Sequence, residues 1–84
     1  MTGKLAISKS GHDKDKLYVI VSEDKEYVYL ADGVIKSVSK PKKKNKKHIQ
    51  IISHIPTEVE AVLKTENGFH DLDIKRAIKL YGNA

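Results

Sequence analysis

The chain has 84 residues, no cysteine, and 16 basic against 11 acidic residues, which gives a net charge of +5. This length allows one domain with a small core, and the lack of cysteine excludes a disulfide framework and a thiolate metal site. The N-terminal residues lack the apolar core of a signal peptide, and no apolar run is long enough to cross a bilayer, so we expect a cytoplasmic protein.

The first half of the chain has the patterns of β-strands. Residues 4–9 alternate apolar and polar side chains, which suits a half-buried strand, and Ser10-Gly11 ends the run. The run LYVIV at residues 17–21 is rich in β-branched and aromatic side chains, which favour a strand over a helix. We therefore predict two strands joined by a polar connection.

The second strand and the next one are predicted to form a hairpin. Residues 22–25 are polar and form its tip, and residues 26–31 form the returning strand. Alternation along this strand places Tyr27 and Tyr29 on one face and two aliphatic side chains on the other. Asp32-Gly33 then gives a strong turn signal, because glycine tolerates positive φ.

A basic loop is expected after a short fourth strand that begins at Val34-Ile35. Residues 36–48 hold seven lysines, one proline that stiffens the chain, and no acidic residue. Outside this loop 11 acidic residues outnumber 9 basic ones, so the excess positive charge belongs to the loop. Such a patch attracts polyanions by Coulomb forces and counterion release, although a lysine run can also be a solvated loop that only keeps the protein in solution.

The predicted fifth strand covers residues 48–53, with Ile49 and Ile51 on one side. Five short strands joined by polar turns are typical of a small closed or nearly closed β-barrel, which we predict for residues 1–55. The fold class would then be mainly β, with the basic loop at residues 36–48 placed before the last strand.

After Pro56 the spacing of the apolar residues changes to that of a helix. The segment from Thr57 to Glu60 matches a capping box, in which each side chain bonds the other residue's backbone amide. Apolar residues at helical spacing follow, and Asn67-Gly68 is a good stop signal. The apolar positions of this first helix are Val59, Val62 and Leu63.

A second helix is predicted from Asp71 to Gly82. Its apolar residues recur at positions i, i+3, i+4 and i+7 and so form a single stripe. These residues are Ile74, Ala77, Ile78 and Tyr81. Because helices of about nine residues are unstable alone in water, we expect residues 56–84 to form a helical extension packed on the barrel.

Three segments of the chain occur in the order and spacing of a known family: ISKSGHDKDKLYVIV at 7–21, YVYLADG at 27–33 and KPKKKNKKHIQ at 40–50. They resemble the KOW domain, and more closely the short KOW-domain RNA-binding proteins of Gram-positive bacteria, which are related to a eukaryotic and archaeal large-subunit ribosomal protein family. The resemblance implies an SH3-like β-barrel and RNA binding, and the last segment, LDIKRAIKLYG, looks like the C-terminal helix of these proteins. The residues in register with the family pattern are Gly11, Asp13, Lys14, Lys16, Leu17, Asp32, Gly33, Pro41 and His48.

Asp15 departs from the family pattern, in which a glycine usually occupies this position of the first loop. If the glycine is needed for a positive φ, aspartate can still adopt that conformation, with less ease. If the glycine is needed for close approach of an RNA backbone, the carboxylate of Asp15 weakens the contact. This departure shifts the expected RNA contacts toward the basic loop.

The candidate RNA-binding residues are cations of the basic loop and of the first loop. Lysine is a mobile point charge that suits phosphates better than base edges, and Arg76 is the only arginine available for bidentate reading of guanine. His48 can stack on a base, contact a phosphate or cap its strand. Tyr18, Tyr27 and Tyr29 can offer stacking faces or be half-buried strand residues. The predicted set is Lys36, Lys40, Lys42, Lys43, Lys44, Lys46, Lys47, His48, Lys14 and His12.

The expected function is RNA binding, and the resemblance implies ribosomal RNA as the partner of a ribosome-associated or translation accessory factor. Ribosomal proteins are a further expected class of partner, a membrane is not, and we expect a monomer when the protein is free. The alternative is a protein-interaction module that binds a transcription or translation partner through the acidic remainder of the domain and the last helix. A third possibility is non-specific binding to DNA or to an anionic surface.

Catalysis and metal binding are not expected. The four histidines have no recognised ligand spacing. The sequence also lacks a cysteine nucleophile, a phosphate-binding glycine loop and a serine within a catalytic motif. We therefore predict no enzyme activity, no metal site and no cofactor.

Overall fold

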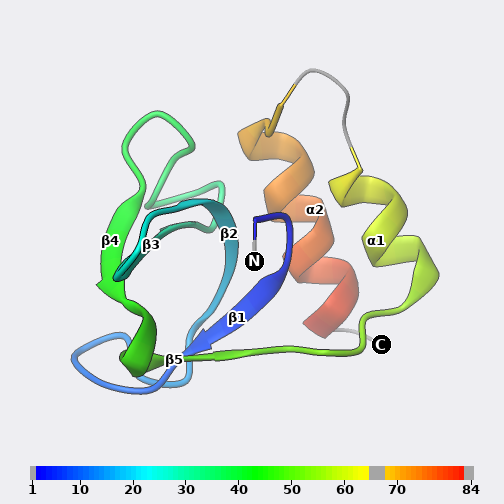
Figure 1. The fold of residues 1–84 in the computed structure, drawn as a ribbon. Helices are drawn as coiled ribbons and strands as arrows, with labels where there is room; N and C mark the ends of the chain where they lie inside the picture. The colour runs from blue at the N-terminus through cyan, green and yellow to red at the C-terminus, as the bar shows by residue number, and fades with distance from the viewer. Residues whose placement is uncertain (1, 65–67, 83–84) are drawn as a thin grey trace.

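The computed structural model describes residues 2–64 and 68–82, which form a five-stranded antiparallel sheet and two helices (Figure 1). The strand order across the sheet is β4-β3-β2-β1-β5. In chain order the elements are β1 (Leu5–Ser8), β2 (Leu17–Glu23), β3 (Tyr27–Ala31), β4 (Lys42–Asn45), the 3₁₀ turn η1 (Lys46–His48), β5 (Ile49–Ile51), α1 (Thr57–Leu63) and α2 (Asp71–Gly82). Within the described residues, no helix has the length and apolar composition needed to span a membrane.

The sheet is open, so the predicted SH3-like β-barrel is wrong, and the molecule is a small α/β protein rather than a mainly β one. β4 and β5 are the two edge strands, and η1 connects them directly. The backbone around η1 bonds elsewhere: the Lys46 amide donates to the Glu26 carbonyl at 3.0 Å, and the His48 carbonyl accepts from the Lys9 amide at 2.8 Å. The chain therefore turns between the two edges instead of pairing them.

The expected strand at Val34-Ile35 is also wrong, because this segment is a tight turn. The Asp32 carboxylate accepts hydrogen bonds from the amides of Val34 and Lys36, both at 2.9 Å. The fourth strand lies instead inside the lysine run, where Lys42–Asn45 pairs with β3. The predicted basic loop is thus partly loop and partly strand.

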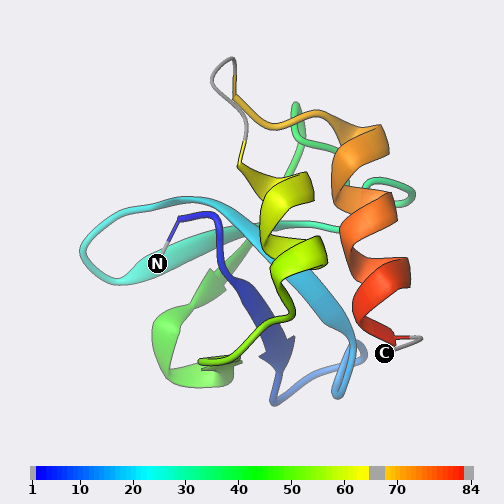
Figure 2. The same ribbon diagram turned by 90° about the vertical axis from the view of Figure 1, so that its right-hand side faces the viewer.

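The two faces of the sheet bury separate apolar clusters. The face covered by the helices buries Leu5, Val19, Ala31, Val59, Leu63, Ile74 and Ala77. The opposite face buries Ala6, Tyr18, Ile20, Val28 and Leu30, with Ile49 and Ile51 packed against them. Both helices lie on one side of the sheet (Figures 1 and 2). The second cluster, which we call the inner cluster, is therefore enclosed by the curvature of the sheet itself.

The second helix agrees with its predicted bounds, and the first differs at its start. α2 runs from Asp71 to Gly82, with Ile74 and Ala77 fully buried. α1 is capped by Pro56, whose carbonyl accepts from the amides of Val59 and Glu60 at 3.0 Å, so the predicted capping box at Thr57 is wrong. The predicted stop signal at Asn67 lies outside the described residues.

Candidate nucleic-acid interface

Strand β4 divides its lysines between the two faces of the sheet. Successive side chains of a strand point to opposite faces. Lys42 and Lys44 are paired in register with Leu30 and Val28, so they share the face of the inner cluster. Lys43 points to the other face. The lysines that the sequence presents as one set therefore have different surroundings.

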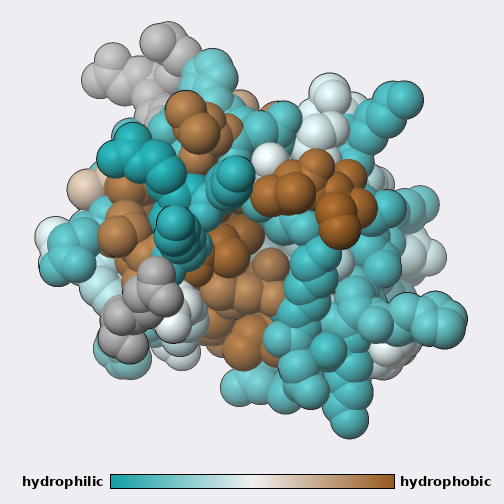
Figure 3. Space-filling model, turned by 180° about the vertical axis from the view of Figure 1, so that it is seen from behind, coloured by the Kyte–Doolittle hydropathy of each residue, from teal (hydrophilic) through white to brown (hydrophobic). Residues whose placement is uncertain are grey.

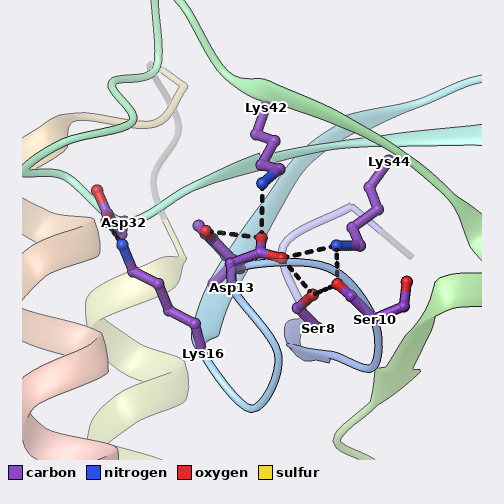
Figure 4. Close-up of polar contacts among 8 residues, drawn as sticks. Ser8, Ser10, Asp13, Lys16, Asp32, Lys42 and Lys44 are labelled. Carbon is purple, nitrogen blue, oxygen red and sulfur yellow. Dashed lines mark hydrogen bonds and ion pairs between the residues drawn. The ribbon is translucent and has the colours of Figure 1, made fainter.

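The inner-face lysines converge on the carboxylate of Asp13, in the loop between β1 and β2 (Figure 4). Asp13 lies 2.9 Å from the Lys42 ammonium and 2.8 Å from the Lys44 ammonium. It also accepts hydrogen bonds from the hydroxyls of Ser8 at 2.9 Å and Tyr18 at 3.0 Å. The side chains of Asp13 and Lys44 are only 10% and 9% exposed, so this ion pair is largely shielded from solvent.

The electrostatic surroundings of Asp13 stabilise its charged form. Burial alone would raise the pKa of Asp13, but the hydrogen bonds from Lys44, Lys42, Ser8 and Tyr18 hold it well below its ordinary value. Burial and the neighbouring carboxylate raise the pKa of the Tyr18 hydroxyl. At neutral pH Asp13 is therefore ionised, and its single negative charge is shared by two ammonium groups, which leaves the cluster with a net charge of +1.

The same cluster joins the β1–β2 loop to β4. The Lys44 ammonium also donates to the Ser10 carbonyl at 2.7 Å. Within the loop, the Asp15 amide donates to the Ser8 carbonyl at 2.8 Å, and Asp15 has a φ of 71°. The sequence suggests two reasons for a glycine at this position: a positive φ and close approach of an RNA backbone. The positive φ is the one that this loop shows. Asp15 adopts it at a modest steric cost.

A second buried carboxylate, Asp32, holds the turn between β3 and β4. Its side chain is 9% exposed and lies 2.8 Å from the Lys16 ammonium. Burial alone would raise the pKa of Asp32, but Lys16 and the amides of Val34 and Lys36 lower it to about 2. Lys16 is therefore engaged in an ion pair with a buried carboxylate, as Lys42 and Lys44 are, although its side chain is 37% exposed.

Two further lysines of the run contact neighbouring side chains near the tip of the β2–β3 hairpin. The Lys46 ammonium lies 3.1 Å from the Glu23 carboxylate. The Lys43 ammonium lies 4.2 Å from the ring centroid of Tyr27, which is a cation–π contact. Both contacts involve partly or fully exposed side chains, so they hold these lysines less firmly than Asp13 holds its partners.

The remaining predicted cations fall into two groups at opposite ends of β4. Lys36 and Lys40 belong to the β3–β4 connection. The other end is formed by the β1–β2 loop and η1, which lie together in Figure 1. Its exposed basic side chains are Lys9, His12, Lys14, Lys47 and His48, and we call this group the basic end. Asp15 is an exposed carboxylate in the same loop.

The structure separates the three candidate stacking tyrosines. Tyr18 is buried and its hydroxyl donates to Asp13. Tyr27 and Tyr29 are half-buried on the face of β3 opposite the inner cluster, which we call the outer face. Lys9 and Lys25 are exposed cations beside the predicted residues but were absent from the predicted set. Sequence reasoning missed them because single lysines in short polar segments carry no signal of their own.

No group of three or more potential metal ligands occurs among residues 2–64 and 68–82. No protein-family model matches this chain, and no curated protein matches it. The geometry of the basic surfaces is therefore the basis for a functional proposal.

Proposed function

We propose that this protein binds RNA through the basic end. The observation that carries the proposal is the joining of two basic segments into one surface. The Lys9 amide bonds the His48 carbonyl, and Lys44 bridges Asp13 and the Ser10 carbonyl. Ammonium groups held on an ordered scaffold attract a phosphate backbone with less ordering cost than a mobile chain.

The proposal predicts a distinctive dependence on salt. If the three lysines of the basic end contact phosphates, the logarithm of the binding constant should fall with the logarithm of salt concentration at a slope of roughly −2 to −3. Replacing Lys14 and Lys47 together by glutamine should reduce the magnitude of that slope by about 1.5 and leave the melting temperature nearly unchanged. Fluorescence anisotropy with a labelled structured RNA measures both quantities.

A matched control is available on α2, where Lys75 and Lys79 are exposed. The double replacement of these lysines by glutamine removes the same charge from another surface and should leave the slope nearly unchanged. Equal effects of the two double variants would show that the basic end is not the site. Absence of binding by the unaltered protein at low salt would refute RNA binding altogether.

The resemblance to KOW-domain proteins supports a narrower proposal, that the ligand is ribosomal RNA and that the protein acts in the cytoplasm as a ribosome-associated or translation accessory factor. Ribosomal proteins are then its expected neighbours. Sedimentation of the protein with ribosomal particles in low-salt gradients, with and without ribonuclease, provides the test. Crosslinking in living cells followed by sequencing of the attached RNA would identify the contact region.

A protein-interaction role is the second candidate, because the surface exposes apolar side chains. Val34, Ile35 and Leu72 are 66%, 73% and 68% exposed. The tight turn at Gly33 packs on the first turn of α2, and Figure 3 shows apolar side chains at the surface on the side seen from behind. The apolar stripe of α2 itself faces the sheet. Binding to a cell extract that survives both moderate salt and ribonuclease would favour this role.

A further inference from the structure

The outer face of β3 carries two tyrosines beyond the edge of the helical layer. Ala31, on the same face, is buried beneath the helices, whereas Tyr27 and Tyr29 lie nearer the hairpin tip and are half-buried. The Tyr29 hydroxyl donates to the Asp24 carboxylate at 2.8 Å, and the same carboxylate accepts from the Tyr27 amide at 2.8 Å. These bonds hold the two aromatic residues in place without a helix over them.

One face of the Tyr27 ring is covered by a flexible ammonium group. Lys43 is exposed and its ammonium lies 4.2 Å from the ring centroid. A cation–π contact at an exposed site is weak, so a planar aromatic group can replace the ammonium at little cost. The displaced ammonium would remain close enough to meet a charge carried by the incoming group.

Two hollows lie near the hairpin tip, and the Tyr27 ring belongs to the lining of one of them. One, of about 330 Å³, is lined by Asp24, Lys25, Glu26, Tyr27 and Lys43. The other, of about 280 Å³, is lined by Lys25, Glu26, Asn45, Lys46 and Lys47. Because Lys25 and Glu26 border both, the hollows form one path from the Tyr27 ring to Lys47 of the basic end. The exposed ammonium groups along this path belong to Lys25, Lys43 and Lys47.

We propose that this path binds an unpaired nucleotide segment, with one base stacked on Tyr27 in place of the Lys43 ammonium. The phosphates beside that base meet the ammonium groups of Lys25, Lys43 and Lys47. Glu26 lines both hollows, and its carboxylate would repel a phosphate but can accept a hydrogen bond from an amino group of the base. The inference rests on the proposed function and deepens it, since it makes the ligand a single strand or an RNA loop.

Only an RNA with unpaired bases can bind along this path. The bases of a duplex are paired and stacked on one another, so none is free to lie on a protein ring. An unpaired base can be splayed out, and each such stacking contact contributes about tenfold or more to affinity. The proposed site therefore favours single-stranded RNA over a duplex of equal charge.

The test compares a labelled single-stranded RNA of mixed sequence with its blunt duplex at one salt concentration. Tyr27→Leu should weaken binding of the single strand about tenfold and leave duplex binding nearly unchanged, because it removes the ring but keeps an apolar side chain. Tyr27→Phe is the matched control and should bind as the unaltered protein does. Melting temperatures of both variants establish that they are folded.

A second measurement needs no variant. Photocrosslinking of the unaltered protein to RNA that contains 4-thiouridine, followed by mass spectrometry, should place adducts at Tyr27 or on the neighbouring hairpin. The inference is overturned if Tyr27→Leu binds both RNAs normally, or if adducts form only at the basic end, while RNA binding itself stands. If the unaltered protein binds neither RNA, the proposed function fails together with this inference.

Discussion

At the scale of single residues, Asp13 decides which lysines can meet a ligand. Seven lysines occur between residues 36 and 47, but two of them form ion pairs with this one carboxylate. A buried ion pair is weak evidence of net stabilisation, yet removing Asp13 leaves Lys44, whose side chain is 9% exposed, as an uncompensated buried charge. Asp13 therefore links the stability of the fold to the net positive charge beside the basic end.

Replacing Asp13 by asparagine tests both consequences. Asparagine keeps an oxygen for the hydroxyls of Ser8 and Tyr18 but loses the charge, so the free energy of unfolding should fall by about 3 kcal/mol. In protein that remains folded, the loss of one negative charge beside the basic end should steepen the salt slope of RNA binding by about 0.8. Denaturant titration and anisotropy measure the two effects.

The control for this prediction is Asp15→Asn, which removes an exposed carboxylate from the same loop and suits the same positive φ. It should change the free energy of unfolding by less than about 0.5 kcal/mol. If the two variants were equally stable, the Asp13 cluster would not contribute to the fold as its geometry indicates.

At the scale of elements, the strands rich in apolar residues could be predicted and β4 could not. Most buried positions of β1 and β2 are apolar, with Ser8 as an exception, whereas the run Lys42-Lys43-Lys44 hides its alternation, since each position has the same residue type. Lysine has a low strand propensity, so tertiary pairing with β3 overrides the local preference. The burial of Lys44 was likewise invisible, because its partner lies 31 residues away in the sequence.

The turn between β3 and β4 is an element whose backbone leaves no room for a side chain. Gly33 has a φ of +79°, and a Cβ built on it would collide with the Asp71 carbonyl oxygen and lie 2.9 Å from the Lys75 amide nitrogen. Both neighbours are backbone atoms at the start of α2, which cannot swing aside. The turn and the helix are further tied by the Val38 amide, which donates to the Asp71 carboxylate at 2.7 Å.

Gly33→Ala should therefore lower the free energy of unfolding by about 3 kcal/mol or more, from backbone strain and overpacking together. Gly68→Ala is the matched control, since Gly68 has a similar φ of +85° but no described atom within 4 Å of its built Cβ. That control should cost only about 1 kcal/mol. Denaturant unfolding of both variants measures the difference, and equal losses would mean that the Gly33 turn is not packed against α2.

At the scale of the whole molecule, strand count alone did not determine whether the sheet would close. The number of strands and the approximate positions of all but β4 could be read from the sequence pattern, but closure depends on whether the two edge strands pair with each other. Here the residues between the edges form η1, and their backbone groups bond Glu26 and Lys9. The candidate RNA surface could not be predicted in full for a similar reason, because its residues come from segments of the sequence that only the fold brings together.

The two buried carboxylates together predict how the fold responds to acid. The pKa of Asp32 is lowered to about 2 and that of Asp13 is lowered further from the same ordinary value of 3.8. The unfolded chain therefore binds more protons than the folded chain as the pH falls through 4. The stabilisation from these carboxylates is present in full above about pH 5 and is lost as the pH falls toward 2, with about 2 kcal/mol from Asp32 alone.

The measurement is the free energy of unfolding between pH 7 and pH 2.5, obtained from denaturant titrations. In the unaltered protein it should fall steadily below pH 5. Asp32→Asn should start from a lower stability at pH 7 and should lose less on acidification, because the carboxylate whose protonation costs the fold is gone. Asp15→Asn should follow the curve of the unaltered protein. An acid curve that Asp32→Asn leaves as steep as before would show that the bond between Lys16 and Asp32 does not hold the β3–β4 turn in solution.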